Sequence, residues 1–552
     1  MSEPDQGFDT FFTTNLEEML DVPIHFDKPL PSWLRGTLIR NGLGMFELGS
    51  RNFTHSFDAF GKLSSWKFYG NGSASFSTNF IKSDFYKDSI DRDDIAPYLM
   101  FESVKPPFNE FQKMEALIRG IDNMNVNVYR FFNRQGNSYE YVVLNDFWKI
   151  YQINPESLGT ISSVTANLPH KGHSGRYTFL SFLSTAHPLP EYGTSNHFTF
   201  VSSVSLIPGI KSRISLIRIK SMEEREEVVS WPVDRVPYMH SFSVTKNYVI
   251  IFAAPFFVNV MNMIRYAAPI KGLDWKSNEP TTIYVINLKT KAVTSLKTAN
   301  VFTMHHVNAF ESGSEIIVDI SSYPNPNFVK NLEVSILKDP IKRNLFDAHA
   351  YLRRYIINLS KESIIFEPIQ GSKTVPFSNN LDLPTINERY RYKEYCFVYG
   401  VVLKIDNVTL SREAIVKKDL CSVDNDKYWY VENHYASEAV FIPSPTEKTE
   451  DDGYLLVPIL DGYRKKSYIA IIDAVSMKII NNADLPTFVP FNLHEEESCI
   501  VVHSNGKESE IDEALSDFLR HAPHQAGGLK YKKPAQADNI PPSQVTTHQQ
   551  PL

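Results

Sequence analysis

The sequence has few cysteines, no strongly basic run and no long apolar run. Its three cysteines, Cys396, Cys421 and Cys499, are too few and too widely spaced for a disulfide framework or a thiolate metal cluster. The net charge of −7 argues against a nucleic-acid partner. No segment reaches the ~18 uninterrupted apolar residues of a membrane-spanning helix. We therefore expect neither a membrane span nor nucleic-acid binding.

Signals that would divide or export the chain are also scarce. The first 21 residues are acidic and lack the basic start and apolar centre of a signal peptide. Together with the scarcity of cysteine, this predicts a reducing, cytoplasmic location. No linker rich in glycine or serine occurs before residue 523, so we expect one compact domain.

The expected division of the chain follows from these observations. It comprises an N-terminal arm at 1–20, one large β-rich domain at 21–503, a helical extension at 504–522 and a tail at 523–552. The tail has almost no large apolar residues and many Pro, Gln and Thr, so it cannot offset its ordering entropy and is expected to be disordered.

The sequence is unusually rich in aromatic residues. They make up 13% of the chain, with 37 Phe and 27 Tyr, while hydrophobic residues at 42% and charged residues at 22% are ordinary for a globular protein. Aromatic side chains favour half-buried strand surfaces, but they also line apolar cavities. Both interpretations stay open at this point.

Short β-branched and aromatic runs bounded by turn residues account for most of the chain, and this pattern predicts an all-β fold. Clear examples of predicted strands are 138–146, 177–183, 198–207, 281–288, 314–323 and 454–463. Few amphipathic helices compete, and the two that stand out are 108–121 and 510–522. Repeated hairpins without a rigid sequence repeat favour a β-propeller with degenerate blades.

The most apolar segment is YVIIFAAPFFVNVMNMI at 248–264, which Pro255, Asn259 and Asn262 interrupt. Its first half is typical of a buried strand. The following stretch, 256–270, is typical of an apolar loop or short helix. Two interpretations stay open for it: packing in the core, or a patch that enters one leaflet of a membrane.

Four of the 16 histidines share a similar setting. They are His187 in LSTAHPLP, His240 in VPYMHSFSVT, His305 in FTMHHVNAFE and His494 in FVPFNLHEEE. Each lies beside an apolar run, at the end of a predicted strand or the start of a turn. Such positions direct side chains toward the axis of a propeller or the mouth of a barrel. Imidazole is a suitable ligand for iron among several metals.

A series of motifs then makes the interpretation specific. In chain order they include GTLIRNGLGMFELG (36–49), THSFDAFGKLSSWKF (54–68), PYMHSFSVTKNYVIIFAAP (237–255), HHVNAFESGSEIIVDI (305–320), EDDGYLLVPILDG (450–462) and LPTFVPFNLH (485–494). In this order and spacing they resemble the carotenoid cleavage oxygenase family, in its animal branch of β-carotene oxygenases and the retinal pigment epithelium isomerohydrolase. The resemblance covers residues 20–500.

The resemblance implies a fold and a metal. The fold is a seven-bladed β-propeller with a cap of helices and loops over the top face, and the metal is one Fe(2+) per chain on the axis. The implied ligands are His187, His240, His305 and His494. In the pair at 305–306 the first histidine matches the ligand, so His306 is expected to be a neighbour of the metal site.

The resemblance also implies carboxylates that accept a hydrogen bond from the free ring nitrogens of three ligands. They are Asp146 for His240, Asp382 for His305 and Glu438 for His494. The family typically has Glu at all three positions, so the two Asp residues, each one methylene shorter, require a strand shift or a bridging water. Other departures are Glu495, where the family often has Gly, and the absence of a PDPC-type segment near 83–94.

The implied function is a dioxygenase that cleaves a conjugated double bond of a carotenoid or apocarotenoid, giving two carbonyl products of the apocarotenal or retinal kind. Its substrates are O2 and a lipophilic polyene in an apolar tunnel, with peripheral membrane contact through 256–270. No catalytic residue is expected beyond the metal set. The alternatives are a retinoid isomerase or isomerohydrolase, a combined isomerooxygenase and, in another class, a catalytically inactive carotenoid-binding propeller.

Overall fold

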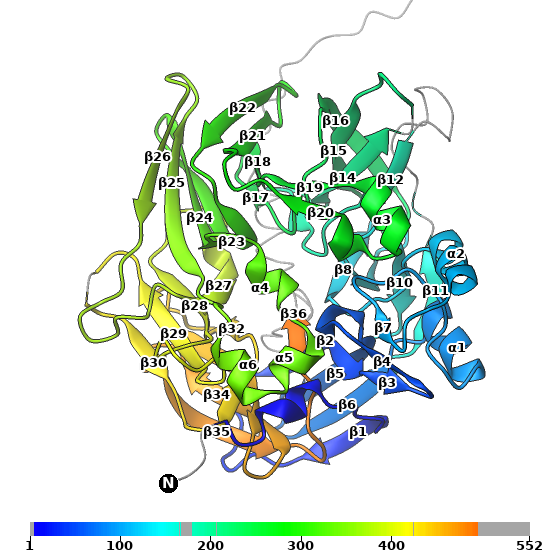
Figure 1. Cartoon of the computed structure of the whole chain (residues 1–552). Coiled ribbons are helices and arrows are strands. Elements are labelled where there is room, and N and C mark those ends of the chain that lie inside the picture. The colour runs from blue at the N-terminus through cyan, green and yellow to red at the C-terminus, as the bar shows by residue number, and fades with distance from the viewer. Residues whose placement is uncertain (1–4, 165, 167–178, 206, 423, 495–552) are drawn as a thin grey trace, which may run out of the picture.

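The computed structural model describes residues 5–164, 166, 179–205, 207–422 and 424–494. The extension expected at 504–522, its helix at 510–522 and the tail expected at 523–552 lie outside these residues, as do Glu495 and Cys499. Most of the described chain forms antiparallel strands joined by short turns (Figure 1).

Within the described ranges, seven antiparallel sheets of four or five strands follow one another along the chain. The first sheet has the order β1 (Met19–Ile24), β6 (Ala74–Phe80), β5 (Phe60–Tyr69), β2 (Arg35–Met45), β36 (Asn492–His494). The second has the order β11 (Thr160–Val164), β10 (Ile150–Ile153), β9 (Ser138–Leu144), β8 (Asn127–Asn133). The third has the order β12 (Phe179–Leu183), β14 (His197–Ser205), β15 (Ser212–Ile219), β16 (Arg225–Val233), with β13 (Leu189–Pro190) also paired to β14.

The remaining four sheets repeat this hairpin pattern. The fourth consists of β17 (Ser243–Val244), β18 (Tyr248–Ala253), β21 (Thr281–Asn287) and β22 (Val293–Thr298). The fifth consists of β23 (Phe302–Ser312), β24 (Glu315–Tyr323), β25 (Tyr351–Asn358) and β26 (Ser363–Pro368). The sixth consists of β27 (Asp382–Thr385), β28 (Phe397–Val402), β29 (Ala414–Asp419) and β30 (Lys427–Trp429). The seventh consists of β31 (His434–Ala436), β32 (Val440–Pro443), β33 (Gly453–Asp461), β34 (Lys466–Asp473) and β35 (Lys478–Asp484).

Figure 1 shows the seven sheets following one another around a common centre, and we call this arrangement the ring of sheets. The ring is closed by β36, which pairs with β2 from the other end of the chain, with His494 opposite Asn41. Two small sheets accompany the ring: β3 (Glu47–Leu48), β4 (Arg51–Phe53) and β7 (Val104–Lys105) form one, and β19 (Phe256–Val258) and β20 (Leu273–Trp275) form the other.

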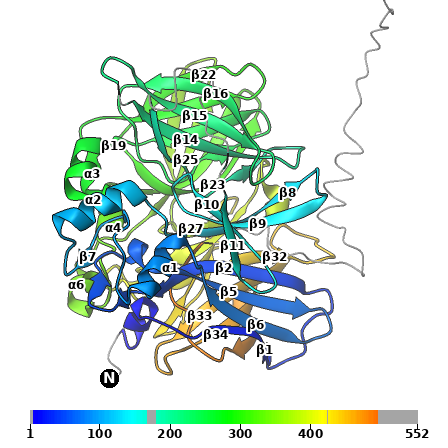
Figure 2. The ribbon, with the colours of Figure 1, turned by 90° about the vertical axis from the view of Figure 1, so that its right-hand side faces the viewer.

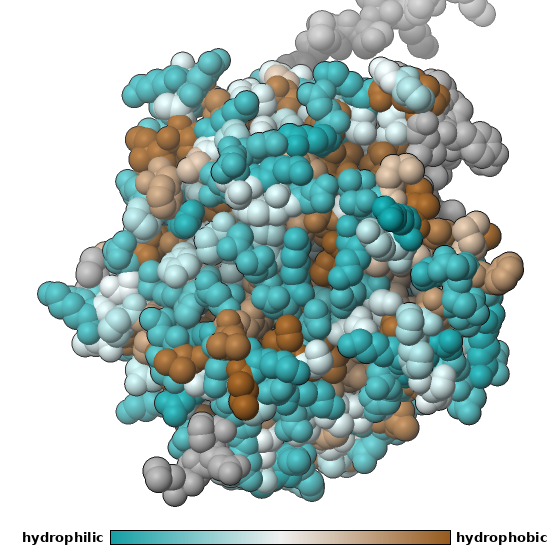
Figure 3. Space-filling view, in the orientation of Figure 1, coloured by the Kyte–Doolittle hydropathy of each residue, from teal (hydrophilic) through white to brown (hydrophobic). Residues whose placement is uncertain are grey.

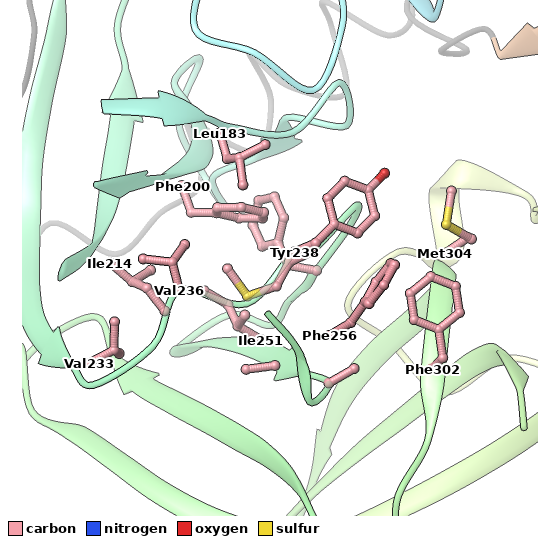
Figure 4. Close-up of a cluster of buried hydrophobic side chains, with 14 of the residues drawn as sticks. Leu183, Phe200, Ile214, Val233, Val236, Tyr238, Ile251, Phe256, Phe302 and Met304 are labelled. Atoms are coloured by element: carbon pink, nitrogen blue, oxygen red, sulfur yellow. The ribbon is translucent and has the colours of Figure 1, made fainter. Parts of the chain in front are cut away.

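The core lies between neighbouring sheets. Trp66 and Phe76 of the first sheet pack with Leu456 and Ile469 of the seventh, and all four side chains are buried. Another cluster joins the third, fourth and fifth sheets, with Phe200, Ile251 and Phe302 among its members (Figure 4). Because both faces of the inner strands are covered, these strands are continuously apolar, as the sequence of β33 illustrates.

The helices gather on one side of the ring of sheets (Figure 2). The α-helices are α1 (Asp84–Asp91), α2 (Glu110–Arg119), α3 (Val260–Tyr266), α4 (Asn327–Lys330), α5 (Val334–Leu337) and α6 (Pro340–Asn344). Short 3-10 helices are η1 (Phe8–Phe12), η2 (Ser56–Asp58), η3 (Pro269–Gly272) and η4 (Glu388–Tyr390). In the described part of the chain, no helix is long and apolar enough to cross a bilayer.

Most predicted elements agree with the structure. The strands expected at 138–146, 198–207, 281–288, 314–323 and 454–463 correspond to β9, β14, β21, β24 and β33, and the helix expected at 108–121 is α2. The strand expected at 177–183 is β12, which begins at Phe179, while residues 177 and 178 are not described. The apolar segment divides as predicted into a strand, β18, and a stretch that contains α3.

The cysteines give a correction. Cys396 and Cys421 form a disulfide, with 5.2 Å between their Cα atoms. They lie just outside the β28–β29 hairpin, so strand pairing brings together two residues that are 25 positions apart in the sequence. Sequence spacing alone did not reveal this pair. Since disulfides are rare in reducing compartments, cysteine usage no longer supports the expected cytoplasmic location.

Candidate metal centre

Three histidines from different parts of the chain converge inside the ring of sheets. His187 lies between β12 and β13, His240 lies between β16 and β17, and His305 lies in β23. One ring nitrogen from each lies within 4.8 Å of those of the other two, and the Nε2 atoms of His187 and His240 are 2.9 Å apart. His240 and His305 are buried and His187 is half-buried. Three nitrogen donors at this spacing can hold one metal ion.

The fourth expected ligand is described only in its backbone. His494 lies in β36, directly opposite Asn41 of β2, near the inner end of the first sheet. Its side chain lies outside the described structure. A ligand role for His494 therefore stays a prediction.

Two aspartates contact the free nitrogens of two histidines. The distance from His240 Nδ1 to Asp146 Oδ2 is 2.7 Å, and from His305 Nδ1 to Asp382 Oδ1 it is 2.6 Å. An ionised carboxylate only accepts, so each Nδ1 carries the proton and donates it. This tautomer leaves Nε2 of each ring as a lone-pair donor for a metal. Despite their shorter side chains, both aspartates reach the rings directly.

The close approach of Asp382 depends on a glycine. Gly400 of β28 lies beside β27, and a Cβ atom added there would lie 2.8 Å from the backbone oxygen of Asp382 and 2.7 Å from Leu381 Cδ1. Such distances are shorter than normal van der Waals contact. Glycine at this position therefore lets β27, which begins with Asp382, approach β28 closely.

Glu438, the third expected carboxylate, lies between β31 and β32 and is buried. Its Oε2 lies 3.4 Å from a terminal nitrogen of Arg40, and the same guanidinium donates to the Glu438 backbone oxygen. Arg40 is fully buried in β2, next to the residue that pairs with His494. A contact between Glu438 and His494 involves a side chain that is not described.

Sequence reasoning missed two tyrosines at this site. The Tyr238 hydroxyl donates to Asp146 Oδ2 at 2.8 Å, and the Tyr323 hydroxyl donates to Asp382 Oδ2. Each aspartate thus accepts one imidazole N–H and one phenol O–H. Tyr238 lies two residues before His240, a spacing that offers a sequence signal, whereas Tyr323 ends β24 and only the fold brings it to Asp382.

Burial and neighbouring charges shift the pKa values of several groups at this site, and not all in the same direction. Burial, with His240 and His305 nearby, lowers the pKa of His187 well below its ordinary value. Burial and the charge of the neighbouring aspartate raise the pKa of Tyr238 and Tyr323 well above the usual range. Burial alone would raise the pKa of Asp382. The neighbouring His305 and the hydrogen bonds that the Asp382 carboxylate accepts outweigh burial, and the pKa of Asp382 lies below its ordinary value. Burial lowers the pKa of His305, but the charge and the hydrogen bond of Asp382 outweigh burial and raise it above its ordinary value. Metal ligands of the imidazole type must be neutral, so a metal at this site competes with a proton for the His305 ring.

His306 is oriented differently from its neighbour. Its Nδ1 lies 2.7 Å from the Ser243 hydroxyl oxygen, and its ring packs edge-on against Phe252 with centroids 5.3 Å apart. The cluster of three nitrogens contains His305 and not His306. His306 thus lies outside the cluster, and the expectation that the first histidine of the pair binds the metal stays a prediction.

Two cavities reach the histidines. The larger has an empty volume of about 1530 Å³, is lined mainly by apolar side chains such as Phe57, Phe101 and Phe147, and reaches His240 and His305. Aromatic residues therefore line a cavity as well as filling the core. The smaller cavity, of about 790 Å³, has a more polar wall that includes His187, His305, Glu388, Arg391 and Glu438.

Comparisons with known proteins place these features in context. A family model described as retinal pigment epithelial membrane protein matches residues 12–495. β,β-Carotene 15,15'-dioxygenase from Homo sapiens is 25% identical over 533 residues, covering 88% of this chain and 94% of that protein. Carotenoid isomerooxygenase from Galleria mellonella is 23% identical over 501 residues, covering 84% of this chain and 91% of that protein.

Solved structures with the same fold include forms of the Synechocystis apocarotenoid oxygenase. A mutant of that protein has a TM-score of 0.73 at 20% identity and covers 89% of this chain and 99% of its own. A cobalt-substituted form has a TM-score of 0.72 at 20% identity and covers 88% of this chain and 97% of its own.

The first prediction concerns the ligand set. His187→Ala, His240→Ala, His305→Ala and His494→Ala should each remove nearly all bound metal, because each deletes a nitrogen donor, whereas His306→Ala should retain it. Metal analysis of the purified proteins measures this. Loss of metal from His306→Ala with retention by His305→Ala would overturn the assignment of the pair.

The second prediction concerns the carboxylate and phenol behind His305. Asp382→Asn should weaken metal affinity by about 10–100-fold, less than removal of His305. Tyr323→Phe should weaken it in the same direction, because the second oxygen of Asp382 loses its donor. Tyr395→Phe is a matched control, since Tyr395 is a buried tyrosine that donates to Asp319 at 2.7 Å, outside the histidine cluster. Competition with a chelator measures affinity, and equal effects of the two tyrosine variants would contradict the assignment.

Proposed function

Because this chain belongs to the retinal pigment epithelial membrane protein family, the carotenoid cleavage oxygenases, we propose that it is an Fe(II)-dependent dioxygenase. Its reaction is the cleavage of a conjugated carbon–carbon double bond in a carotenoid or apocarotenoid, giving two carbonyl products. The observation that carries this proposal is the cluster of three histidines in the walls of two cavities, one large and apolar. The larger cavity brings a wide apolar space up to His240 and His305 of this cluster.

In this proposal His187, His240, His305 and His494 hold one Fe(2+) per chain, and Asp146, Asp382 and Glu438 orient three of the rings. When bound, the iron supplies the binding and activation of O2. In the same proposal, the seven sheets are the blades of a seven-bladed propeller. The helices on one side, together with their loops, form its cap. Residues 21–503 then form one catalytic domain.

The chain's own contribution is to position the substrate. The apolar wall of the large cavity removes the polyene from water, with Phe57, Phe101 and Phe147 among the lining residues. The Asp146–His240 and Asp382–His305 hydrogen bonds fix the imidazoles before the substrate arrives. Where the polyene stops along the cavity then determines which double bond lies at the metal. This reaction requires no side chain as acid or base.

A combined isomerooxygenase is the second candidate, because the relative from Galleria mellonella carries that name. A dioxygenase and an isomerooxygenase both incorporate oxygen into the products. They differ in the double-bond geometry of one product. A pure isomerase or isomerohydrolase would leave the carbon chain intact. A carrier without activity would bind the polyene and release it unchanged.

The third prediction separates these functions. The iron-loaded protein, given a carotenoid and labelled O2, should yield two carbonyl products that each carry label before exchange with water, and metal removal should abolish both. Mass analysis detects the label, and chromatography assigns the double-bond geometry. An isomerised, uncleaved polyene would instead support an isomerase, and unchanged polyene with no iron bound would support a carrier.

Access from a membrane is part of the proposal. The five most exposed large apolar side chains in the described structure all lie on the side of the helices: Phe111 at 88%, Leu345 at 84%, Ile118 at 82%, Ile341 at 77% and Met261 at 74%. Figure 3 shows apolar residues at the surface over α2 and α6. Exposed apolar side chains gathered on one face are typical of an interaction surface.

The large cavity begins close to this face. Met263 of α3, Pro269 of η3 and Leu273 of β20 line it, while Met261 of α3 faces outward. The stretch 256–270 is therefore partly core and partly exposed surface. We propose that the outward side chains of α2, α3 and α6 enter one leaflet and that the polyene passes from lipid into the cavity.

The fourth prediction tests this face. Met261→Asp combined with Phe111→Asp should reduce binding to liposomes by about tenfold or more, since burial of one large apolar side chain contributes about 1.5–3 kcal/mol. Bound metal should be unchanged. Ile365→Asp is the control, because Ile365 is 54% exposed on β26, away from the helices in Figure 1. Unaltered liposome binding by the double variant would indicate a soluble donor of the polyene.

A further inference from the structure

A buried carboxyl group lies in the wall of the large cavity, apart from the histidines. Glu413 immediately precedes β29 and has 1% of its surface exposed. The cavity wall around it includes Phe8 and Phe12 of η1, Phe346 and Leu410, which belong to a single apolar cluster. A carboxyl group is unexpected in such surroundings, because burial without hydrogen bonds is costly.

The Glu413 carboxyl is not satisfied by the protein. Among the described residues, its Oε2 has no hydrogen-bond partner. Arg343 is the charged group that acts on it. This guanidinium donates to the Leu337 backbone oxygen at 2.6 Å and pairs with Asp5 at 3.4 Å, while its Nε has no hydrogen-bond partner among the described residues. Asp146 and Asp382, which line the same cavity, both receive two or more hydrogen bonds. A buried polar atom left unpaired requires an explanation, and a missing ligand is one.

The protonation state of Glu413 indicates which ligand groups suit it. Burial raises the pKa of this carboxyl well above its usual range, and the opposing charge of Arg343 does not offset the effect. This shift favours the neutral form of the carboxyl. A neutral carboxyl both donates and accepts a hydrogen bond, so it can pair with a hydroxyl group or with a carbonyl oxygen.

We propose that Glu413 binds an oxygen atom at one end of the polyene, so that the preferred substrates are hydroxylated carotenoids or apocarotenoids and not hydrocarbon carotenoids. This inference rests on the proposed function, because it requires that the large cavity hold the substrate. Glu413, His240 and His305 line the same cavity. Fixing the oxygenated end at Glu413 thus fixes which double bond lies at the metal, and Glu413 determines both substrate preference and the position of cleavage.

The fifth prediction uses two polyenes that differ in their hydroxyl groups. Zeaxanthin carries one hydroxyl on each ring and β-carotene carries none, and an apocarotenal serves as a third substrate with a terminal carbonyl. The iron-loaded full chain should have a higher kcat/KM for zeaxanthin than for β-carotene. Glu413→Leu should lower this ratio by about tenfold or more, because one buried hydrogen bond is lost. Glu413→Leu should also give a mixture of cleavage positions.

Two further variants make the test specific. Glu413→Gln is nearly isosteric and keeps a donor and an acceptor, so it should retain most of the preference. Leu403→Met changes the same cavity wall without a polar group and should leave the ratio between the two substrates at the wild-type value. The apocarotenal arm distinguishes a carbonyl from a hydroxyl as the preferred oxygen.

Stability and binding measurements separate the remaining outcomes. If Glu413 only serves the fold, for instance as a partner of Arg343, Glu413→Leu lowers the thermal unfolding midpoint and leaves the substrate ratio unchanged, which overturns the inference. Wild-type protein that cleaves both polyenes equally well also overturns it while leaving the proposed function intact. If neither the two polyenes nor the apocarotenal is cleaved, the proposed function fails, and fluorescence quenching by the two polyenes then decides whether Glu413 recognises the hydroxyl.

Discussion

Closure of the ring of sheets is the constraint on which the rest of the structure depends. The last described strand, β36, pairs with β2, so the two ends of a long chain meet in one sheet. The junction is reinforced where Phe491 stacks with Phe12 and its backbone bonds to that of Phe11. Until it closes, the first sheet lacks an edge strand and the cavity lacks part of its wall. Such long-range pairing carries a large entropic cost, which the apolar clusters between neighbouring sheets offset.

A ring built in this way provides a small central space into which side chains from many sheets project. His187, His240 and His305 come from successive sheets, while Asp146 and Asp382 arrive from sheets on either side of them. The histidine–aspartate hydrogen bonds therefore connect different sheets of the ring. Because the bonds are buried, the geometry of the donors is set by the whole ring and not by one loop. The hydroxyls of Tyr238 and Tyr323 complete both aspartates.

The sequence predicted the features that have a local signature. Strand periodicity indicated β14, β21, β24 and β33, and the motifs around His187, His240 and His305 indicated residues that the fold brings together. Contacts between distant segments had no such signature. Tyr323 reaches Asp382 only through the packing of two sheets, and Cys396 meets Cys421 only across a hairpin. No sequence motif indicated Glu413, because its unusual feature is the apolar environment around its carboxyl group, and only the fold creates that environment.

His305 lies in the walls of both cavities, one almost entirely apolar and one of mixed polarity. A water-insoluble compound can thus approach the histidine nitrogens through the apolar cavity, and a water-soluble compound can approach them through the more polar cavity. Because the two compounds use different cavities, neither blocks the entry of the other, and they can bind in either order. The same difference in polarity affects how products leave, since each product partitions into the cavity that matches its own polarity. His305 is the histidine of the cluster that lines both cavities, so its imidazole ring lies at the boundary between the apolar and the more polar space.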